Sequence, residues 1–288
     1  MDYKILFEKT EMPSEAVELF YTLEEKKNAD PALADEIAQI LALHGTDVAA
    51  CEKRATELSE KLKIAKCSFL LYVQLLLCEK AYNAYIKNGW DIEVFYDSMS
   101  DICIRIQRNY KRYKSQNVGI DNFLWLAGFI KLTRFKIGRL EYDIFEIIDG
   151  FEFELDGSKY AKGDKVIYMH IPGYLKFTKE ACMDSYKRVR DFMEKNLGMD
   201  RNTPIITRTW MLHPFLKKVL GPDSALAGFQ DDFIIQYVMD DDAPIEWVFG
   251  DKKDNIDDYP QETSLQRATV AHMKNGGAIG RAMGILKY

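Results

Sequence analysis

The chain has 288 residues, more than the roughly 100–200 residues of a typical single domain, so we expect two domains. Its 47% hydrophobic and 29% charged residues are typical of a folded globular protein and exclude a disordered one. The net charge of −6 argues against nucleic acid as a partner.

Residues 1–133 predict helices throughout and are interpreted as an all-helical N-terminal domain. Asp30, Asp47 and Asp91 each stand where a helix N-cap is expected, and Pro31 suits a first helical position. The segment 68–87 is apolar nearly all round, which is typical of a central buried helix. We expect a single helix over residues 92–114 and another over 121–134.

From Phe135 the apolar period changes from that of a helix to that of a strand. Leu140 and Tyr142 alternate with Arg139 and Glu141, a pattern that predicts a strand with one solvated face. Further strands are predicted over residues 151–155, 165–171, 204–212, 233–240 and 246–250, with a glycine-rich edge strand over 278–286. The predicted fold class is α+β, with a mixed β-sheet domain flanked by helices over residues 134–288.

A strand, a Pro-Gly loop and a helix follow one another directly in the stretch 165–193. Thr178 is the expected N-cap of this helix, and Thr263 with Gln266 forms a capping box for a later one. A loop between a strand end and a helix start directs main-chain N–H groups outward, and the helix dipole favours an anion there. The stretch therefore predicts an anion-binding loop.

His170 and Glu141 are the candidate proton acceptors. His170 ends the strand before this loop, where sheets of this kind place reactive groups, and Glu141 is a candidate general base. The alternatives are a histidine that satisfies a local main-chain group, and a solvated strand face with an Arg–Glu pair. Residues 105–114 form the most basic stretch, interpreted as a phosphate contact or as a solvated helix end.

Several motifs that would fix a function are absent. The four histidines form no HxH or HExxH pattern, and the five widely spaced cysteines form no CxxC pair, so we expect neither a metal site nor a disulfide framework. There is no GxGxxG or GxxxxGK[ST] phosphate loop. A reducing compartment fits the cysteine usage, and no segment resembles a signal peptide or a membrane span, so we expect a cytoplasmic protein without membrane contact.

Several separated segments resemble one family of bacterial acyltransferases. The segments are FKIGRLEYDI, VIYMHIPGYLKFTKEACMDSYKRVRDFM, TRTWMLHPFLKKVLGPDSALAGF and ETSLQRATVAHMKNGG, together with VFYDSMSDICIRIQRNYKRY and FLWLAGFIKLTRFKIGRL in the helical half. That family has a helical N-terminal domain and a GNAT-like C-terminal domain. The resemblance covers most of the chain, and the segments occur in the family's order.

The resemblance implies an N-acyltransferase that uses acetyl-CoA or another acyl-CoA and acts on a small-molecule amine or a peptide. The proton acceptors would be Glu141 and His170. The loop positions implied to bind the donor are Ile171, Gly173, Tyr174, Lys176 and Thr178, and those implied to line the acceptor cleft are Arg139, Tyr168, Thr209 and Trp210. The usual GNAT loop, [R/Q]xxGx[G/A], is absent, and residues 172–178 occupy its place. The alternative is a non-catalytic binding protein built on a degenerate GNAT-like domain.

Overall fold

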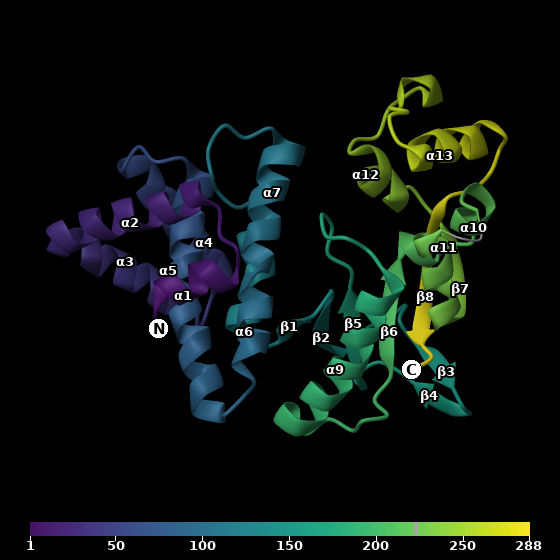
Figure 1. Ribbon diagram of the computed structural model, residues 1–288, viewed down its shortest axis with the longest axis horizontal. Coiled ribbons are helices and arrows are strands. Elements are labelled where there is room, and N and C mark those ends of the chain that lie inside the picture. The colour runs from purple at the N-terminus through teal and green to yellow at the C-terminus, as the bar shows by residue number, and fades with distance from the viewer. Residues whose placement is uncertain (222–223) are drawn as a thin grey trace. The chain divides into compact units, whose positions relative to one another are not determined.

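The structure is a computed structural model that describes residues 1–221 and 224–288, without the side chain of Arg112. It divides into two compact units. The first unit comprises Met1–Asp143 with Ile171–Leu175, and the second comprises Ile144–His170 with Lys176–Tyr288. Figure 1 labels the helices and strands.

The described helices of the first unit are α1 (Tyr3–Lys9), α2 (Ser14–Ala29), α3 (Pro31–Leu43), α4 (Val48–Lys61), α5 (Lys66–Asn88), α6 (Ile92–Met99), α7 (Asp101–Tyr113) and α8 (Phe123–Ile130). The three predicted aspartate caps are confirmed, because Asp30, Asp47 and Asp91 each accept a hydrogen bond from a main-chain N–H in the first turn of the helix. The central position of α5 is also confirmed, since its Leu71, Tyr72 and other side chains are fully buried.

The prediction of one helix over residues 92–114 is wrong. The helix is interrupted at Ser100, between α6 and α7. The Ser100 hydroxyl donates to the main-chain carbonyl of Asp97 at 2.6 Å, a local bond that competes with the helical pattern. The break gives α7 a start of its own, with Asp101 in its first turn, where the helix dipole favours a negative charge.

Strands β1 (Arg134–Ile137) and β2 (Leu140–Glu146) form an antiparallel hairpin whose turn holds Gly138 at φ 64°. The hairpin is attached to α6, because Ser98 Oγ accepts from the Lys136 N–H at 3.0 Å and Asp97 accepts from the Gly138 N–H at 3.1 Å. The expected solvated face is therefore wrong: Glu141 is 0% exposed and Arg139 9%. The residue opposite Glu141 on the neighbouring strand is Lys136, and no Arg–Glu cross-strand pair forms there.

Six strands form one mixed sheet in the order β1-β2-β5-β6-β8-β7, and two more form a separate hairpin. The remaining strands of the large sheet are β5 (Lys165–His170), β6 (Ile205–Thr209), β7 (Phe233–Asp240) and β8 (Gly280–Leu286), and the small hairpin pairs β3 (Phe153–Leu155) with β4 (Ser158–Tyr160). Strands β5 and β6 are parallel, whereas β8 is antiparallel to both of its neighbours. Phe151 and Phe153 pack with Ile206 and Met283 in one apolar cluster. The predicted α+β class is confirmed.

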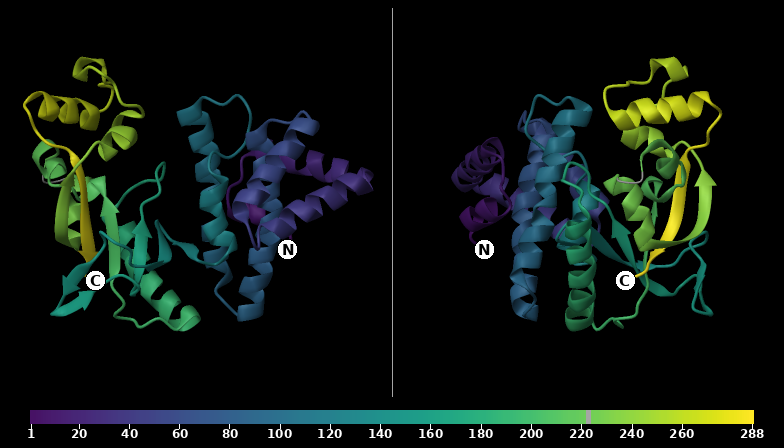
Figure 2. Two further views of the ribbon diagram at one scale, coloured as in Figure 1. Left: turned by 180° about the vertical axis from the view of Figure 1, so that it is seen from behind. Right: turned by 45° about the vertical axis from the view of Figure 1, so that its right-hand side comes forward.

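The glycine-rich strand β8 lies inside the sheet, between β6 and β7 (Figures 1 and 2), so its prediction as an edge strand is wrong. Its glycines allow close approach of neighbouring chain segments. A Cβ on Gly280 would lie 1.9 Å from the Met239 carbonyl oxygen, and one on Gly284 would lie 2.7 Å from Leu212. Strand β7, with Ile235 37% exposed, forms the edge.

The described helices of the second unit are α9 (Lys179–Leu197), α10 (Phe215–Val219), α11 (Ala225–Phe229), α12 (Ala243–Phe249) and α13 (Ser264–Lys274), with short 3-10 helices η1 (Trp210–Leu212), η2 (Gln230–Asp232) and η3 (Ile256–Asp258). The strand predicted over residues 246–250 is wrong, because α12 occupies this segment. Pro244 lies in its first turn, and Ile245 and Val248 are buried at helical spacing. The capping box of Thr263 and Gln266 is confirmed. In the described residues, no helix combines the length and apolarity needed to cross a bilayer.

Candidate functional site

The parallel strands β5 and β6 separate toward their C-terminal ends. Their register pairs Ile167 with Ile205 and Tyr168 with Ile206. Beyond these pairs, the Tyr168 hydroxyl donates to the Arg208 carbonyl at 3.2 Å and accepts from the Arg208 N–H at 3.1 Å. A side chain of β5 thus bonds the main-chain groups of β6 that would otherwise face a neighbouring strand. The sheet opens at this point.

The Tyr168 side chain at this opening is uncharged and is packed against other rings. Burial raises the pKa of the Tyr168 phenol above its usual value near 10, so the hydroxyl keeps its proton. The rings of Phe145 and Phe151 lie 5.3 and 6.0 Å from its ring, centroid to centroid. The half-buried His170 lies on the same face of β5, with its ring 4.8 Å from that of Tyr168. The structure therefore brings together two residues predicted for the site.

Helix α9 begins close along the chain from the end of β5. Thr178 is confirmed as its N-cap, since the Thr178 hydroxyl accepts from the Ala181 N–H at 3.3 Å. The other main-chain N–H groups of a first helical turn have no partner within the helix, and the helix dipole adds positive potential there. Lys176 is exposed, and the Lys179 ammonium lies 3.3 Å from Asp232. This helix start suits an anion.

Residues 171–175 of the loop belong to the first unit. Tyr174 has φ 62°, an uncommon conformation for a residue other than glycine, and is 45% exposed. The Lys111 ammonium lies 5.1 Å from the Tyr174 ring, and Arg139 donates to the Leu175 carbonyl at 3.4 Å. A Cβ added at Gly173 would meet no heavy atom within 4 Å, so this glycine leaves room for a ligand to approach the main chain.

The other two residues predicted for the cleft lie at the end of β6, the partner strand of β5: Thr209 is the last residue of β6 and Trp210 follows it. The Thr209 hydroxyl accepts from the Met211 N–H at 3.3 Å and so caps η1. Trp210 begins η1 and is half-buried. By strand alternation, Thr209 faces the side of the sheet opposite to Arg208. Its hydroxyl therefore serves first as a helix cap.

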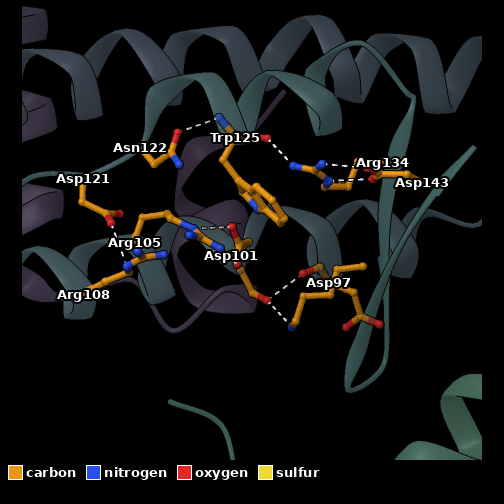
Figure 3. A network of polar contacts seen from close by, with 11 residues as sticks. Asp97, Asp101, Arg105, Arg108, Asp121, Asn122, Trp125, Arg134 and Asp143 are labelled. Carbon is orange, nitrogen blue, oxygen red and sulfur yellow. Dashed lines mark hydrogen bonds and ion pairs between the residues drawn. The ribbon is translucent and has the colours of Figure 1, made fainter. Parts of the chain in front are cut away.

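Buried charges connect α7, α8 and the β1–β2 hairpin in the first unit (Figure 3). Arg105 donates two hydrogen bonds to Asp101, at 2.8 and 3.3 Å, and Arg134 donates two to Asp143, at 2.6 and 2.7 Å. The ring of Trp125 lies between the two arginines, 5.1 Å from the guanidinium carbon of Arg105 and 3.5 Å from that of Arg134. The interpretation of the basic stretch as a solvated helix end is wrong for Arg105, which is 5% exposed. The predicted basic side chain of Arg112 lies outside the described residues.

Glu141 belongs to this buried group. Both of its carboxyl oxygens are buried, and no donor among the described residues reaches them. Burial raises the pKa of Glu141 well above its usual value near 4.5, and the nearby Asp101 carboxylate, which can accept the Glu141 proton, raises it further. Arg105 and Arg134 oppose this shift without cancelling it. The folded state therefore favours the protonated, neutral form of Glu141.

The free energy of unfolding of the Glu141→Gln variant is expected to increase relative to that of the wild type as pH rises. Between the usual pKa and the raised one, the folded state binds a proton that the unfolded state has lost, so the wild type loses stability through this range. Glutamine removes this titration and keeps a donor for Asp101. Urea unfolding of both proteins from pH 5 to pH 8 measures the difference.

The matched control for this measurement is Glu146→Gln, at the exposed end of the same strand. We expect its difference from the wild type to be small at every pH. A Glu141→Gln variant that is less stable than the wild type throughout, or by a constant amount, would contradict a neutral Glu141.

Arg208 is the residue of this site that the sequence interpretation missed. Its half-buried side chain shares a sheet face with Tyr168 and His170 and lies over the Phe151 ring, with 3.8 Å between guanidinium carbon and ring centroid. The only available signal was a charge inside the apolar strand segment PIITRTW. In the described ranges 1–221 and 224–288, no group of three or more His, Cys, Asp and Glu side chains is placed to hold a metal ion.

Comparison with known families accounts for both halves of the chain. Residues 1–132 match the family described as "N-acyltransferase N-terminal domain". Residues 134–286 match the family described as "GNAT-like C-terminal domain". The chain belongs to this GNAT-like N-acyltransferase family. The predicted family resemblance is thereby confirmed.

Solved structures share the fold of this GNAT-like chain at low sequence identity. An acyltransferase in complex with decanoyl-CoA and teicoplanin is 19% identical, with a TM-score of 0.72 over 98% of this chain and 86% of that one. An acyltransferase in complex with CoA and 10C-teicoplanin is 19% identical, with a TM-score of 0.73 over 99% and 87%. An acyltransferase in complex with decanoyl-CoA is 20% identical, with a TM-score of 0.71 over 99% and 86%. Among proteins with curated descriptions, none matches the sequence significantly.

Proposed function

We propose that this protein transfers an acyl group from an acyl-CoA to the amine of a small molecule or peptide. The observation that carries the proposal is the opening between β5 and β6, held by the two Tyr168–Arg208 hydrogen bonds, in a chain of this family. Related folds have been solved with decanoyl-CoA and with octanoyl-CoA, which supports an acyl-CoA as the donor. The five cysteines are free, which favours a reducing compartment such as the cytoplasm.

We propose separate places for the pantetheine arm and for the pyrophosphate of CoA. The pantetheine arm carries amides, and the edge of a strand binds such groups through its main-chain donors and acceptors. The pyrophosphate is an anion, which suits the start of α9 with Thr178 and the nearby cation of Lys176. A role of Ile171, Gly173 and Tyr174 in donor binding stays a prediction.

The chemistry needs one group to accept a proton from the attacking amine. The amine nitrogen forms a bond to the thioester carbonyl carbon, and the carbon–sulfur bond breaks so that the CoA thiolate leaves. We propose that His170 takes the amine proton, directly or through water, while main-chain N–H groups at the end of β5 polarise the carbonyl. A role for Glu141 as the base stays a prediction, tested by the turnover of Glu141→Gln.

Calorimetric titration with CoA, acetyl-CoA, octanoyl-CoA and decanoyl-CoA tests the proposal. We expect binding of at least one acyl-CoA, and release of free thiol when an amine is added. Absence of binding at millimolar donor, with a cooperative unfolding transition that shows folded protein, would refute the enzyme. Binding without thiol release over a broad amine panel would instead favour the non-catalytic alternative.

A further inference from the structure

Three basic side chains share one face of the sheet at the opening between β5 and β6. His170 and Arg208 lie on the same face, because each stands two residues beyond a residue of the parallel register. Arg281 comes from β8, where Met283 pairs with Arg208, so Arg281 also points to this face. This face therefore carries the Arg208 guanidinium on the strand next to His170, the proposed proton acceptor.

The guanidinium of Arg208 is held in place without an anionic partner. Its carbon lies 3.8 Å from the centroid of Phe151, a side chain that is only 7% exposed. Its main chain is fixed on one side by Tyr168 and on the other by β8. Within the described part of the chain, the guanidinium makes no ion pair and no hydrogen bond to a protein group. A planar ion that is oriented in this way has its N–H donors available to a ligand.

Two other arginines of the sheet differ from Arg208 in this respect. Arg281 pairs with Asp241 at 2.8 Å, and Arg134 in the first unit pairs with Asp143 at 2.6 Å. Arg208 is thus the basic residue of this face whose charge the described chain leaves uncompensated. A half-buried charge of this kind is unfavourable unless an anion neutralises it.

We propose that Arg208 binds a carboxylate of the acceptor, so that the acceptor is an amino acid, or a peptide whose terminal carboxylate lies close to its amine. Arg208 would orient the acceptor by two parallel hydrogen bonds, a geometry that suits guanidinium and carboxylate. Its amine would then lie toward His170, on the adjacent strand and the same face. This inference rests on the proposed acyl transfer and names its acceptor class.

The test uses matched pairs of acceptors with the best acyl-CoA donor. Each pair consists of a proteinogenic amino acid and the same amino acid with its α-carboxylate replaced by a carboxamide. For the wild type we expect kcat/KM to favour the carboxylate by roughly 10–100-fold. Arg208→Gln should lose this preference because its kcat/KM falls for the acids alone. Arg208→Lys should keep an intermediate preference, because lysine retains the charge but lacks the paired N–H donors of a guanidinium. Arg281→Gln is the matched control, since Asp241 already neutralises Arg281, and it should keep most of the preference.

Calorimetric binding of the same acids and amides supplies a readout that needs no turnover. Acids that bind only when Arg208 is present support the site even if no acyl group is transferred, and then only the proposed function fails. Equal binding of acids and amides, equal losses for both in Arg208→Gln, or no binding of any acid at 50 mM would overturn the carboxylate site. Unchanged donor binding and unfolding transition in Arg208→Gln exclude a damaged fold.

Discussion

Replacing Arg105 with methionine is expected to lower the free energy of unfolding by about 3–5 kcal/mol. Asp101 is fully buried, and Arg105 compensates the charge of Asp101 through two hydrogen bonds. Methionine fills a similar volume but leaves this carboxylate without a cation in a region that water does not reach. Equilibrium unfolding in urea at pH 7 measures the loss.

Two further variants separate this effect from a general sensitivity to lost charge. Lys162→Met removes a surface ion pair with Asp149, whose side chains are 67% and 79% exposed, and should change stability by less than about 1 kcal/mol. The double variant Asp101→Leu/Arg105→Met removes both buried charges and should recover much of the stability. A loss in Arg105→Met no larger than that in Lys162→Met would show that the buried pair contributes little.

Replacing His170 with alanine is expected to lower kcat by about 10²–10⁴-fold, the range for removal of a general base. The imidazole ends β5 at the sheet opening, beside Tyr168, where the attacking amine would lie. Affinity for the acyl-CoA should stay near that of the wild type, because the groups proposed to bind the donor are main-chain groups and the side chains of other residues. Steady-state rates and donor titrations together measure this separation.

The pH dependence of kcat distinguishes a base from a structural histidine. The wild-type profile should have an acidic limb where His170 is protonated, and the limb should disappear in His170→Ala. His170→Asn serves as the second variant, since it keeps a polar side chain of similar reach but cannot take the proton. A loss below tenfold, or an unchanged acidic limb, would assign the proton to another acceptor.

Local chemistry explains which parts of the fold could be predicted. Asp47, Thr178 and the Thr263–Gln266 box bond main-chain N–H groups within one helical turn, so their effect depends only on nearby sequence. By contrast, the position of β8 depends on which strands border it. Its glycines suggested a peripheral tail, but they are required because Met239 and Leu212 approach closely.

The environment of the charged residues could not be predicted for the same reason. Alternation along β2 correctly separated two sets of side chains, but it could not show that Glu141 is buried near Asp101 and Arg105 of α7. The same pattern would have described a solvated strand. Arg208 likewise became a candidate only when the register placed it beside Tyr168 and above Phe151.

The place of β8 in the sheet has a consequence for biosynthesis. Strands β6 and β7 are joined only through β8, so the sheet cannot close until residue 286 has left the ribosome. The first unit draws on the chain up to Asp143 and a short later segment, and its helices are synthesised long before. During elongation, both β6 and β7 have unpaired edges, and β7 carries exposed Ile234 and Val238. Nascent chains of this protein are therefore most prone to aggregate after β7 has been synthesised and before β8 has paired with it.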